Sequence, residues 1–189
     1  MTKCASESFS GTHLFVPGGP AMAEKHNIGP VHDCNSRVLI LGSFPSVKSR
    51  EEAFYYAHPQ NRFWRILERL FASSRLDSTE EKKAFLLSHR IALWDVIGEC
   101  TITGSSDSSI RDVVANDLSV ITSSSRIEAV FTNGRKADAL YRKYQEKETG
   151  MKAHNLPSSS PANAQWSLER LTDEWRIVKE VLDKQGERA

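Results

Sequence analysis

Four short apolar segments alternate with helical patterns along this chain of 189 residues. Each segment is rich in apolar or β-prone residues and is bounded by polar turn residues, which is typical of buried strands. The alternation of strands and helices predicts a mostly parallel sheet with helices on both faces. The predicted strands cover residues 37–41, 91–96, 129–132 and 152–156.

Helices are predicted between these strands from apolar spacing and from capping signals. Apolar side chains recur at helical intervals over residues 63–71, 137–144 and 168–182. The run Ser78-Thr79-Glu80-Glu81 matches a capping box and predicts a helix up to Ser88. Residues 101–125 are rich in Ser, Thr and Asp, and one helix is expected there, around 112–121.

Residues 1–25 are polar and small and contain the cluster Pro17-Gly18-Gly19-Pro20. They predict a flexible arm before a single domain over residues 26–189. Charged residues make up 26% and hydrophobic residues 39%, which excludes a disordered tail protein and a membrane protein. No apolar run of about 18 residues and no secretory signal is visible, so a cytoplasmic location without a membrane partner is expected.

The charge and the cysteines give weaker constraints. A formal net charge of +1 does not point to nucleic acid, but binding it requires only a local basic face. Cys4, Cys34 and Cys100 are widely scattered and form no Cys-x-x-Cys pair. A metal or iron–sulfur site built on thiolates is therefore not expected, and the cysteines are interpreted as ordinary reduced thiols.

Three polar segments, at residues 42–61, 133–136 and 156–163, follow predicted strands. In a parallel sheet the turns after the strands meet at one edge, and open α/β sheets bind their ligands there. These segments are therefore where chemistry is expected.

The same segments carry a resemblance to a known family. Leu-Ile-Leu-Gly-Ser-Phe-Pro-Ser at 39–46, Tyr-Tyr-Ala-His-Pro-Gln-Asn-Arg-Phe-Trp at 55–64 and Leu-Pro-Ser-Ser-Ser-Pro-Ala-Asn at 156–163 resemble the uracil-DNA glycosylase superfamily. They are most similar to its hypoxanthine (deoxyinosine) DNA glycosylase branch, over roughly residues 26–183. The resemblance implies a three-layer α/β/α sandwich with a central four-stranded parallel sheet. It also implies a monomer that acts on DNA containing deaminated bases, with no cofactor, metal ion or iron–sulfur cluster.

The chain departs from other branches of the superfamily at two places. Many members carry Asp or Asn two residues after the glycine of the first motif, where Phe44 stands here. In the hypoxanthine branch an Asn of the His-Pro-x-Asn segment is taken to replace it, which is Asn61 in this chain. Many uracil enzymes have His-Pro-Ser or Asn-Pro-Ser in the third motif, where this chain has Ser158-Ser159-Ser160. Both departures weaken the case for uracil as the main substrate.

Asn61 is the candidate catalytic residue. Cleavage of an N-glycosidic bond builds positive charge on the sugar and negative charge on the base, so it needs electrostatic support and a held water. The side-chain carbonyl of an asparagine can orient that water. Alternatively, Asn61 caps the helix that follows it, which is a common role of asparagine.

Contacts with the flipped base are expected from the first and third segments, because such a base needs a stacking surface and polar groups along its edge. Tyr56 and Phe44 would supply the stacking surface, although both residue types are common at a core rim. Gly42 and Ser43 would let the backbone approach the base, or would only form a tight turn. His58 would donate to the base or order its own turn. The base-binding set is Gly42, Ser43, Phe44, Tyr56, His58, Ser158 and Ser159.

Contacts with the DNA backbone are expected mainly from the second and third segments. Asn133-Gly134-Arg135-Lys136 precedes a predicted helix, whose first amides and two cations suit a phosphate. A capped helix with a solvated charge pair explains the same residues equally well. Ser160-Pro161 also matches a helix N-cap followed by proline. The DNA-binding set is Pro45, Ser46, Asn133, Gly134, Arg135, Lys136, Ser160 and Asn163.

Other residues have structural or peripheral roles in this interpretation. Trp64 and Trp175 lie on apolar helix stripes and are predicted to be core residues. Asp95 closes the second predicted strand, and the resemblance places that strand end beside the base pocket. A basic rim, or only a solvated helix face, is expected from Lys48, Arg50, Arg62 and Arg65.

The leading hypothesis for function is a DNA-deoxyinosine glycosylase that excises hypoxanthine, the product of adenine deamination, in base excision repair. The alternatives are a uracil or mismatch-specific glycosylase of the same fold, and a damaged-DNA-binding module without turnover. The absence of an acidic residue in the first motif motivates the module. An esterase-like hydrolase is disfavoured, because Gly42-Ser43-Phe44-Pro45-Ser46 is not a Gly-x-Ser-x-Gly elbow.

Overall fold

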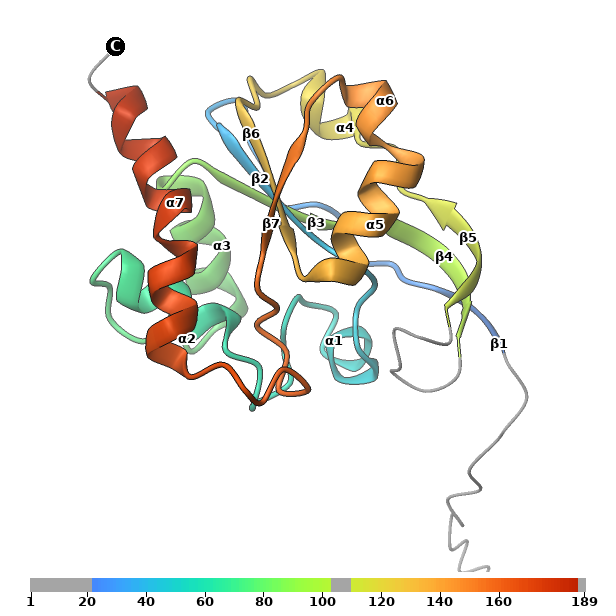
Figure 1. The fold of residues 1–189 in the computed structure, drawn as a ribbon, viewed down its shortest axis with the longest axis horizontal. Coiled ribbons are helices and arrows are strands. Elements are labelled where there is room, and N and C mark those ends of the chain that lie inside the picture. Colours follow the sequence, from blue (N-terminus) through green and yellow to red (C-terminus); the bar gives the residue numbers. More distant parts are fainter. Residues whose placement is uncertain (1–21, 103–109, 187–189) are drawn as a thin grey trace, which may run out of the picture.

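The computed structural model describes residues 22–102 and 110–186 (Figure 1). Helices lie between the four strands that the sequence predicts, and three further strands among the described residues interrupt the alternation. The strands are β1 Met22–Lys25, β2 Val38–Gly42, β3 Ile91–Asp95, β4 Ile97–Ile102, β5 Arg111–Ala115, β6 Ala129–Asn133 and β7 Ala153–Leu156. The helices are α1 Val47–Glu51, α2 Phe63–Leu70, α3 Thr79–Ser88, α4 Ser119–Thr122, α5 Arg135–Tyr144, α6 Glu146–Thr149 and α7 Leu168–Gly186.

A parallel four-stranded sheet in the order β3-β2-β6-β7 forms the middle of the molecule. Helices α2, α3 and α7 cover one face and α5 covers the other, as Figure 1 shows. The predicted α/β class, the three layers and the parallel sheet are confirmed, and each predicted strand agrees with the structure to within one residue at its ends. β2 and β3 are buried along their whole length, which explains why both read as unbroken apolar runs.

The structure also contains a second, antiparallel sheet in the order β1-β4-β5, which the sequence pattern does not predict. It continues from the first sheet, because only Val96 separates β3 from β4. The prediction of a helix around residues 112–121 is wrong. Residues 111–115 pair with β4 as a strand, and the helix that follows is limited to Ser119–Thr122. Val113 and Val114 favour the strand, because β-branched side chains pack well on a pleated surface.

Four residues of the predicted N-terminal arm form a strand. Met22–Lys25 pair with β4 as strand β1, so these four residues belong to the second sheet. The rest of the predicted arm, residues 1–21, lies outside the described residues. The division into an arm and one domain remains a prediction.

The core between the sheet and the helices α2 and α7 contains a cluster of aromatic side chains. Trp64 is 6% exposed and Trp175 is fully buried, so both predicted core residues are confirmed. Phe63 lies between them and meets each ring edge-on. Because Phe63 begins α2, this core fixes the start of the helix, and with it the segment that contains Asn61.

The parallel strands all end at the same edge of the sheet. Gly42 is paired with Asp95, and Asn133 with Leu156, at the ends of adjacent strands. Figure 1 shows α1 and the loop between β7 and α7 at this edge. The three polar segments singled out in the sequence therefore follow strand ends that lie side by side.

Candidate active site

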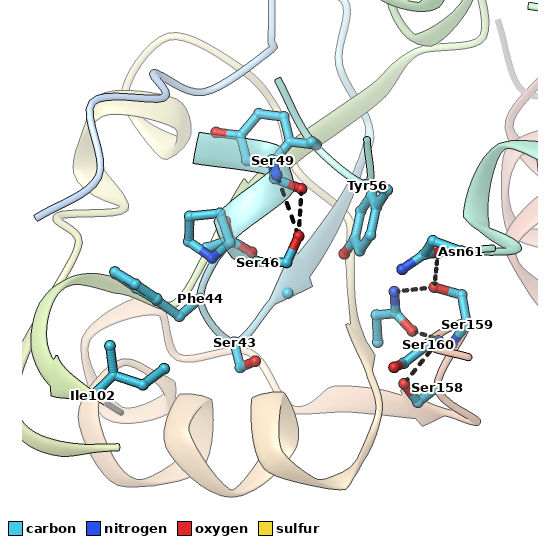
Figure 2. A pocket seen from close by; sticks show the side chains of 15 residues that line it. Ser43, Phe44, Ser46, Ser49, Tyr56, Asn61, Ile102, Ser158, Ser159 and Ser160 are labelled. Carbon is cyan, nitrogen blue, oxygen red and sulfur yellow. Dashed lines mark hydrogen bonds between the residues drawn. The ribbon is translucent and has the colours of Figure 1, made fainter. Parts of the chain in front are cut away.

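A cavity of about 120 Å³ opens at this edge of the sheet, large enough for several water molecules. Figure 2 shows side chains from the three segments around it. Its lining residues are Gly42, Ser43, Phe44, Pro45, Ser46, Ser49, Tyr55, Tyr56, Asn61, Asp95, Ile102, Asn133, Ser158, Ser159 and Ser160.

The turn after β2 forms one wall of the cavity. The Ser46 side chain accepts a hydrogen bond from the Ser49 amide at 3.2 Å and so caps α1. Arg50 donates to the Pro45 carbonyl at 2.9 Å, and its guanidinium lies 5.4 Å from the centre of the Phe44 ring. Ser46 and Arg50 therefore hold the turn in place from within the protein.

Gly42 sits where the backbone must come close to other groups. A Cβ at this position would lie 2.2 Å from Asp95 Oδ1 and 2.9 Å from the Tyr56 hydroxyl oxygen. No side chain fits in that space without moving both groups. Glycine is therefore required by the close approach of Asp95 and Tyr56, and not only by a turn.

Tyr56 lies between the aromatic core and the cavity. Its backbone adopts φ +53°, a left-handed conformation that is uncommon for a bulky residue. Its ring stacks on Phe63, with 4.0 Å between the ring centres and 19° between the planes. One face of Tyr56 therefore packs on the core, while the residue also lines the cavity.

Asn61 is held by two donors at its side-chain oxygen. The Phe63 amide donates to Oδ1 at 3.0 Å, and the Ser159 hydroxyl donates to the same oxygen at 2.9 Å. A carbonyl oxygen offers two lone pairs, so both are used here. Figure 2 shows the amide nitrogen on the side of the cavity. The capping alternative is thus present in part, and the cavity receives a hydrogen-bond donor.

Asp95 adds a buried carboxyl group to the cavity wall. It is 3% exposed and pairs with Gly42 across β2 and β3. The pKa of the neighbouring Tyr55 hydroxyl is raised, first by burial and second by the charge of Asp95. Tyr55 accordingly stays protonated and donates to the carbonyls of Ile28 and Gly29, at 3.0 and 2.9 Å.

Arg62, in the motif at residues 55–64, binds the backbone of the motif at residues 156–163 and of the loop that follows it. Its backbone amide and its Nε donate to the Ser159 carbonyl, at 3.1 and 3.2 Å. Its other guanidinium nitrogens donate to the carbonyls of Ser160, Asn163 and Trp166. Burial lowers the pKa of Arg62 from its very high ordinary value. The guanidinium is therefore engaged within the protein and not displayed as part of a basic rim.

Exchanging Arg62 for lysine should destabilise the protein by about 2 kcal/mol, because an ammonium group cannot reproduce this fork of hydrogen bonds. Urea denaturation of both proteins measures the difference. The control is Arg65→Lys on the exposed side of α2, which should change the free energy of unfolding by less than about 0.5 kcal/mol. Equal effects at Arg62 and Arg65 would show that the fork contributes nothing.

Most of the predicted site residues meet at the cavity, but five do not line it. Gly134, Arg135 and Asn163 line an adjacent cavity of about 510 Å³ together with Ser158 and Ser160. His58 and Lys136 line neither cavity.

The structure favours local roles for several of these residues. His58 accepts from the Gln60 amide at its Nδ1, at 3.2 Å, which is the turn-ordering alternative. The helix N-cap expected at Ser160-Pro161 is wrong. These residues form a turn in which Ser160 Oγ accepts from the Ala162 amide, and the next helix begins at Leu168.

The cavity wall also depends on His26, whose ring meets Phe44 edge-on at 5.4 Å. Its Nδ1 accepts from the Ile28 amide at 3.3 Å, and its Nε2 lies 2.7 Å from the Ile97 carbonyl. Because an amide can only donate, this arrangement requires a neutral ring protonated at Nε2. Burial is the main cause that lowers the pKa of His26 below its ordinary value of 6.5.

Stability should therefore fall as the pH drops below about 6.5, because the unfolded chain takes up a proton there that folded His26 resists. Urea denaturation between pH 7.5 and 5 measures this. His26→Gln should lose this part of the pH dependence, since a glutamine amide offers one donor and one acceptor without titrating. Identical pH profiles for the two proteins would contradict the assignment.

The described residues contain no group of three or more His, Cys, Asp or Glu side chains placed to hold a metal ion. Cys34 and Cys100 form no disulfide with each other, and Cys4 lies outside the described residues. In the part of the chain that the structure describes, no helix is long and apolar enough to cross a membrane.

Comparison with known proteins agrees with this architecture. The family model of the uracil DNA glycosylase superfamily matches residues 29–182, and the chain belongs to that superfamily. A protein of Methanosarcina acetivorans named hypoxanthine DNA glycosylase is 38% identical over 158 residues, which cover 82% of this chain and 97% of that protein. A protein of the same name from Methanosarcina barkeri is 31% identical over 144 residues, covering 74% of this chain and 89% of that protein.

A solved structure supports the fold directly. The solution NMR structure of a uracil-DNA-glycosylase-like protein from Methanosarcina acetivorans superposes with a TM-score of 0.73 at 35% sequence identity. The match covers 86% of this chain and 99% of the other. Membership of the superfamily expected from the three motifs is thus confirmed.

Proposed function

We propose that this protein is a monofunctional DNA glycosylase that removes hypoxanthine from DNA in base excision repair. One observation carries the proposal: in a chain of this superfamily, all three motif loops converge on a cavity lined by Tyr56, Asn61 and Asp95. Two relatives that share 38% and 31% identity carry the name hypoxanthine DNA glycosylase. The proposed enzyme acts as a monomer, without metal or cofactor.

The proposed reaction is hydrolysis of the bond between N9 of the base and C1′ of the deoxyribose. The bond electrons leave with the base, the oxygen of a water molecule joins C1′, and the departing base gains a proton. The base enters the cavity after it has flipped out of the duplex. Tyr56 and Phe44 would stack on it, and the backbone at Gly42 and Ser43 would approach its edge.

Asn61 would position the attacking water. Since Phe63 and Ser159 occupy its side-chain oxygen, the group nearest the cavity is the amide nitrogen. Water that accepts a hydrogen bond from this nitrogen keeps a second lone pair for attack on the cation-like sugar. Asn61 would therefore hold the water without acting as a base.

Asp95 is suited to read the base edge. Hypoxanthine carries a hydrogen on N1, whereas adenine has a lone pair there. A carboxylate accepts a hydrogen bond from N1 of hypoxanthine and repels the lone pair on N1 of adenine. The buried position of Asp95 strengthens that contrast, because solvent does not screen it. Discrimination of hypoxanthine against adenine would follow from this contact.

Contacts with the DNA backbone would come from the rim between the two cavities. Arg135 is exposed at the start of α5 and lines the adjacent cavity, with Lys136 beside it. These cations suit phosphates, together with the first amides of α5. Pro45, Ser46 and Ser160 complete the proposed contact surface.

Excision assays on defined duplexes test the proposal. Duplexes with one hypoxanthine, uracil, xanthine or ethenoadenine are incubated with excess protein and EDTA and then cleaved with alkali at abasic sites. We expect hypoxanthine to be excised fastest and normal adenine not at all. Faster excision of uracil would identify a uracil glycosylase instead. Tight binding to inosine DNA without base release would identify a damage-binding module.

A further inference from the structure

Ser159 links two side chains of the cavity and is itself completely buried. Its hydroxyl accepts from Asn133 Nδ2 at 2.9 Å and donates to Asn61 Oδ1 at 2.9 Å. Its backbone amide donates to Asn133 Oδ1 at 2.9 Å. Figure 2 shows the hydrogen bond between Ser159 and Asn61 at one side of the cavity. The whole chain of hydrogen bonds joins the end of β6, the loop after β7 and the segment before α2.

The direction of every hydrogen bond in this chain follows from its two ends. The Ser159 amide can only donate, so Asn133 must turn its oxygen toward it and its nitrogen toward the Ser159 hydroxyl. The hydroxyl has one hydrogen and already accepts from Asn133, so that hydrogen goes to Asn61. The Phe63 amide fixes the Asn61 oxygen from the other end. A flip of either asparagine would point its NH2 group at a backbone amide, which can only donate, and would lose that hydrogen bond.

We infer that Ser159, oriented by Asn133, is a positioning residue that holds the Asn61 amide in its reactive orientation. The inference rests on the proposed function, because it assigns a role in base excision. Ser159 touches Asn61 but acts through it, whatever atoms Asn61 contacts in the cavity. The low polarity around a buried hydroxyl makes this hydrogen bond stronger than it would be in water.

Single-turnover excision of hypoxanthine with saturating enzyme tests the inference. Ser159→Ala should lower the rate constant about tenfold, and by no more than Asn61→Ala does, because Ser159 acts through Asn61. In an Asn61→Ala background the same change should alter the rate less than about twofold, because two residues that act as one unit are not additive. The matched control is Ser125→Ala, which removes another buried hydroxyl, one that donates to the Asp33 carbonyl, and should leave the rate unchanged.

Asn133→Asp separates positioning from simple packing. A carboxylate at this position accepts from both the Ser159 amide and the Ser159 hydroxyl, and such charge-assisted bonds are the stronger ones. The hydroxyl hydrogen would therefore turn away from Asn61 although Ser159 is intact. We expect a rate loss like that of Ser159→Ala, and no further loss when the two changes are combined.

The outcomes are distinguishable from failure of the proposed function. A wild-type rate in Ser159→Ala, or an equal loss in the wild-type and Asn61→Ala backgrounds, overturns the inference while the glycosylase remains. No excision by the wild-type protein on any duplex overturns the function. The NMR chemical shifts of the Asn61 side-chain amide then test whether Ser159 positions this group. The shifts should change in Ser159→Ala and Asn133→Asp but not in Ser125→Ala. Unchanged shifts in the first two variants would contradict the inference.

Discussion

Gly42→Ala should abolish most hypoxanthine excision, with a rate at least about a hundredfold below that of the wild-type protein. The new methyl group would lie 2.2 Å from Asp95 Oδ1 and 2.9 Å from the Tyr56 hydroxyl, so both groups must move. A displacement of about 1 Å in a catalytic site has effects of this size. The strain should also destabilise the fold by about 1–3 kcal/mol. Single-turnover excision and urea denaturation measure the two effects.

Gly29→Ala is the matched control for this change. A Cβ at Gly29 meets no atom within 4 Å, so the substitution should leave the excision rate unchanged and stability within about 0.5 kcal/mol. If Gly42→Ala excised hypoxanthine at the wild-type rate, the close packing of Gly42, Asp95 and Tyr56 would have no part in the reaction.

Asn61→Ala should reduce excision at least about tenfold, because it removes one contact of the transition state. Loss of the hydrogen bonds from the Phe63 amide and the Ser159 hydroxyl should lower the free energy of unfolding by about 2 kcal/mol, so the protein should remain folded. Affinity for inosine DNA should change little. Single-turnover rates, urea denaturation and fluorescence anisotropy with labelled duplex separate these three quantities.

Asn35→Ala controls for the loss of an amide side chain, since Asn35 is exposed and lies outside the cavity. It should leave excision unchanged. Equal rates for Asn61→Ala and the wild-type protein would remove Asn61 from the mechanism. A rate loss that matches a loss of folded protein would reduce Asn61 to a helix cap.

The central sheet could be predicted because its signals are local. Residues 38–42 and 91–95 are buried on both faces, so each strand is an apolar run that ends at a polar turn. The capping box at Ser78 is equally local, and both of its hydrogen bonds are present. The second sheet has no such signal. Its strand at 111–115 depends on pairing with β4, and it lies in a Ser- and Asp-rich segment that has no strand pattern of its own.

In the candidate site, too, features with a local sequence signal could be predicted and contacts between distant residues could not. The motifs placed Gly42, Tyr56 and Asn61 at one edge of the sheet, and the structure brings them to one cavity. The Ser159 hydrogen bonds could not be predicted, because they join residues 98 and 26 positions apart. The internal role of Arg62 has no signal in the sequence for a similar reason, since the carbonyls that bind it come from a loop about a hundred residues later.

The most direct test of this account is the release of free base by the wild-type protein. An inosine-containing duplex is incubated with excess enzyme, and chromatography with mass spectrometry quantifies free hypoxanthine and abasic DNA. The proposed reaction yields one equivalent of hypoxanthine for each abasic site, and Asn61→Ala should form both far more slowly. Intact inosine DNA after prolonged incubation with folded wild-type protein would contradict it.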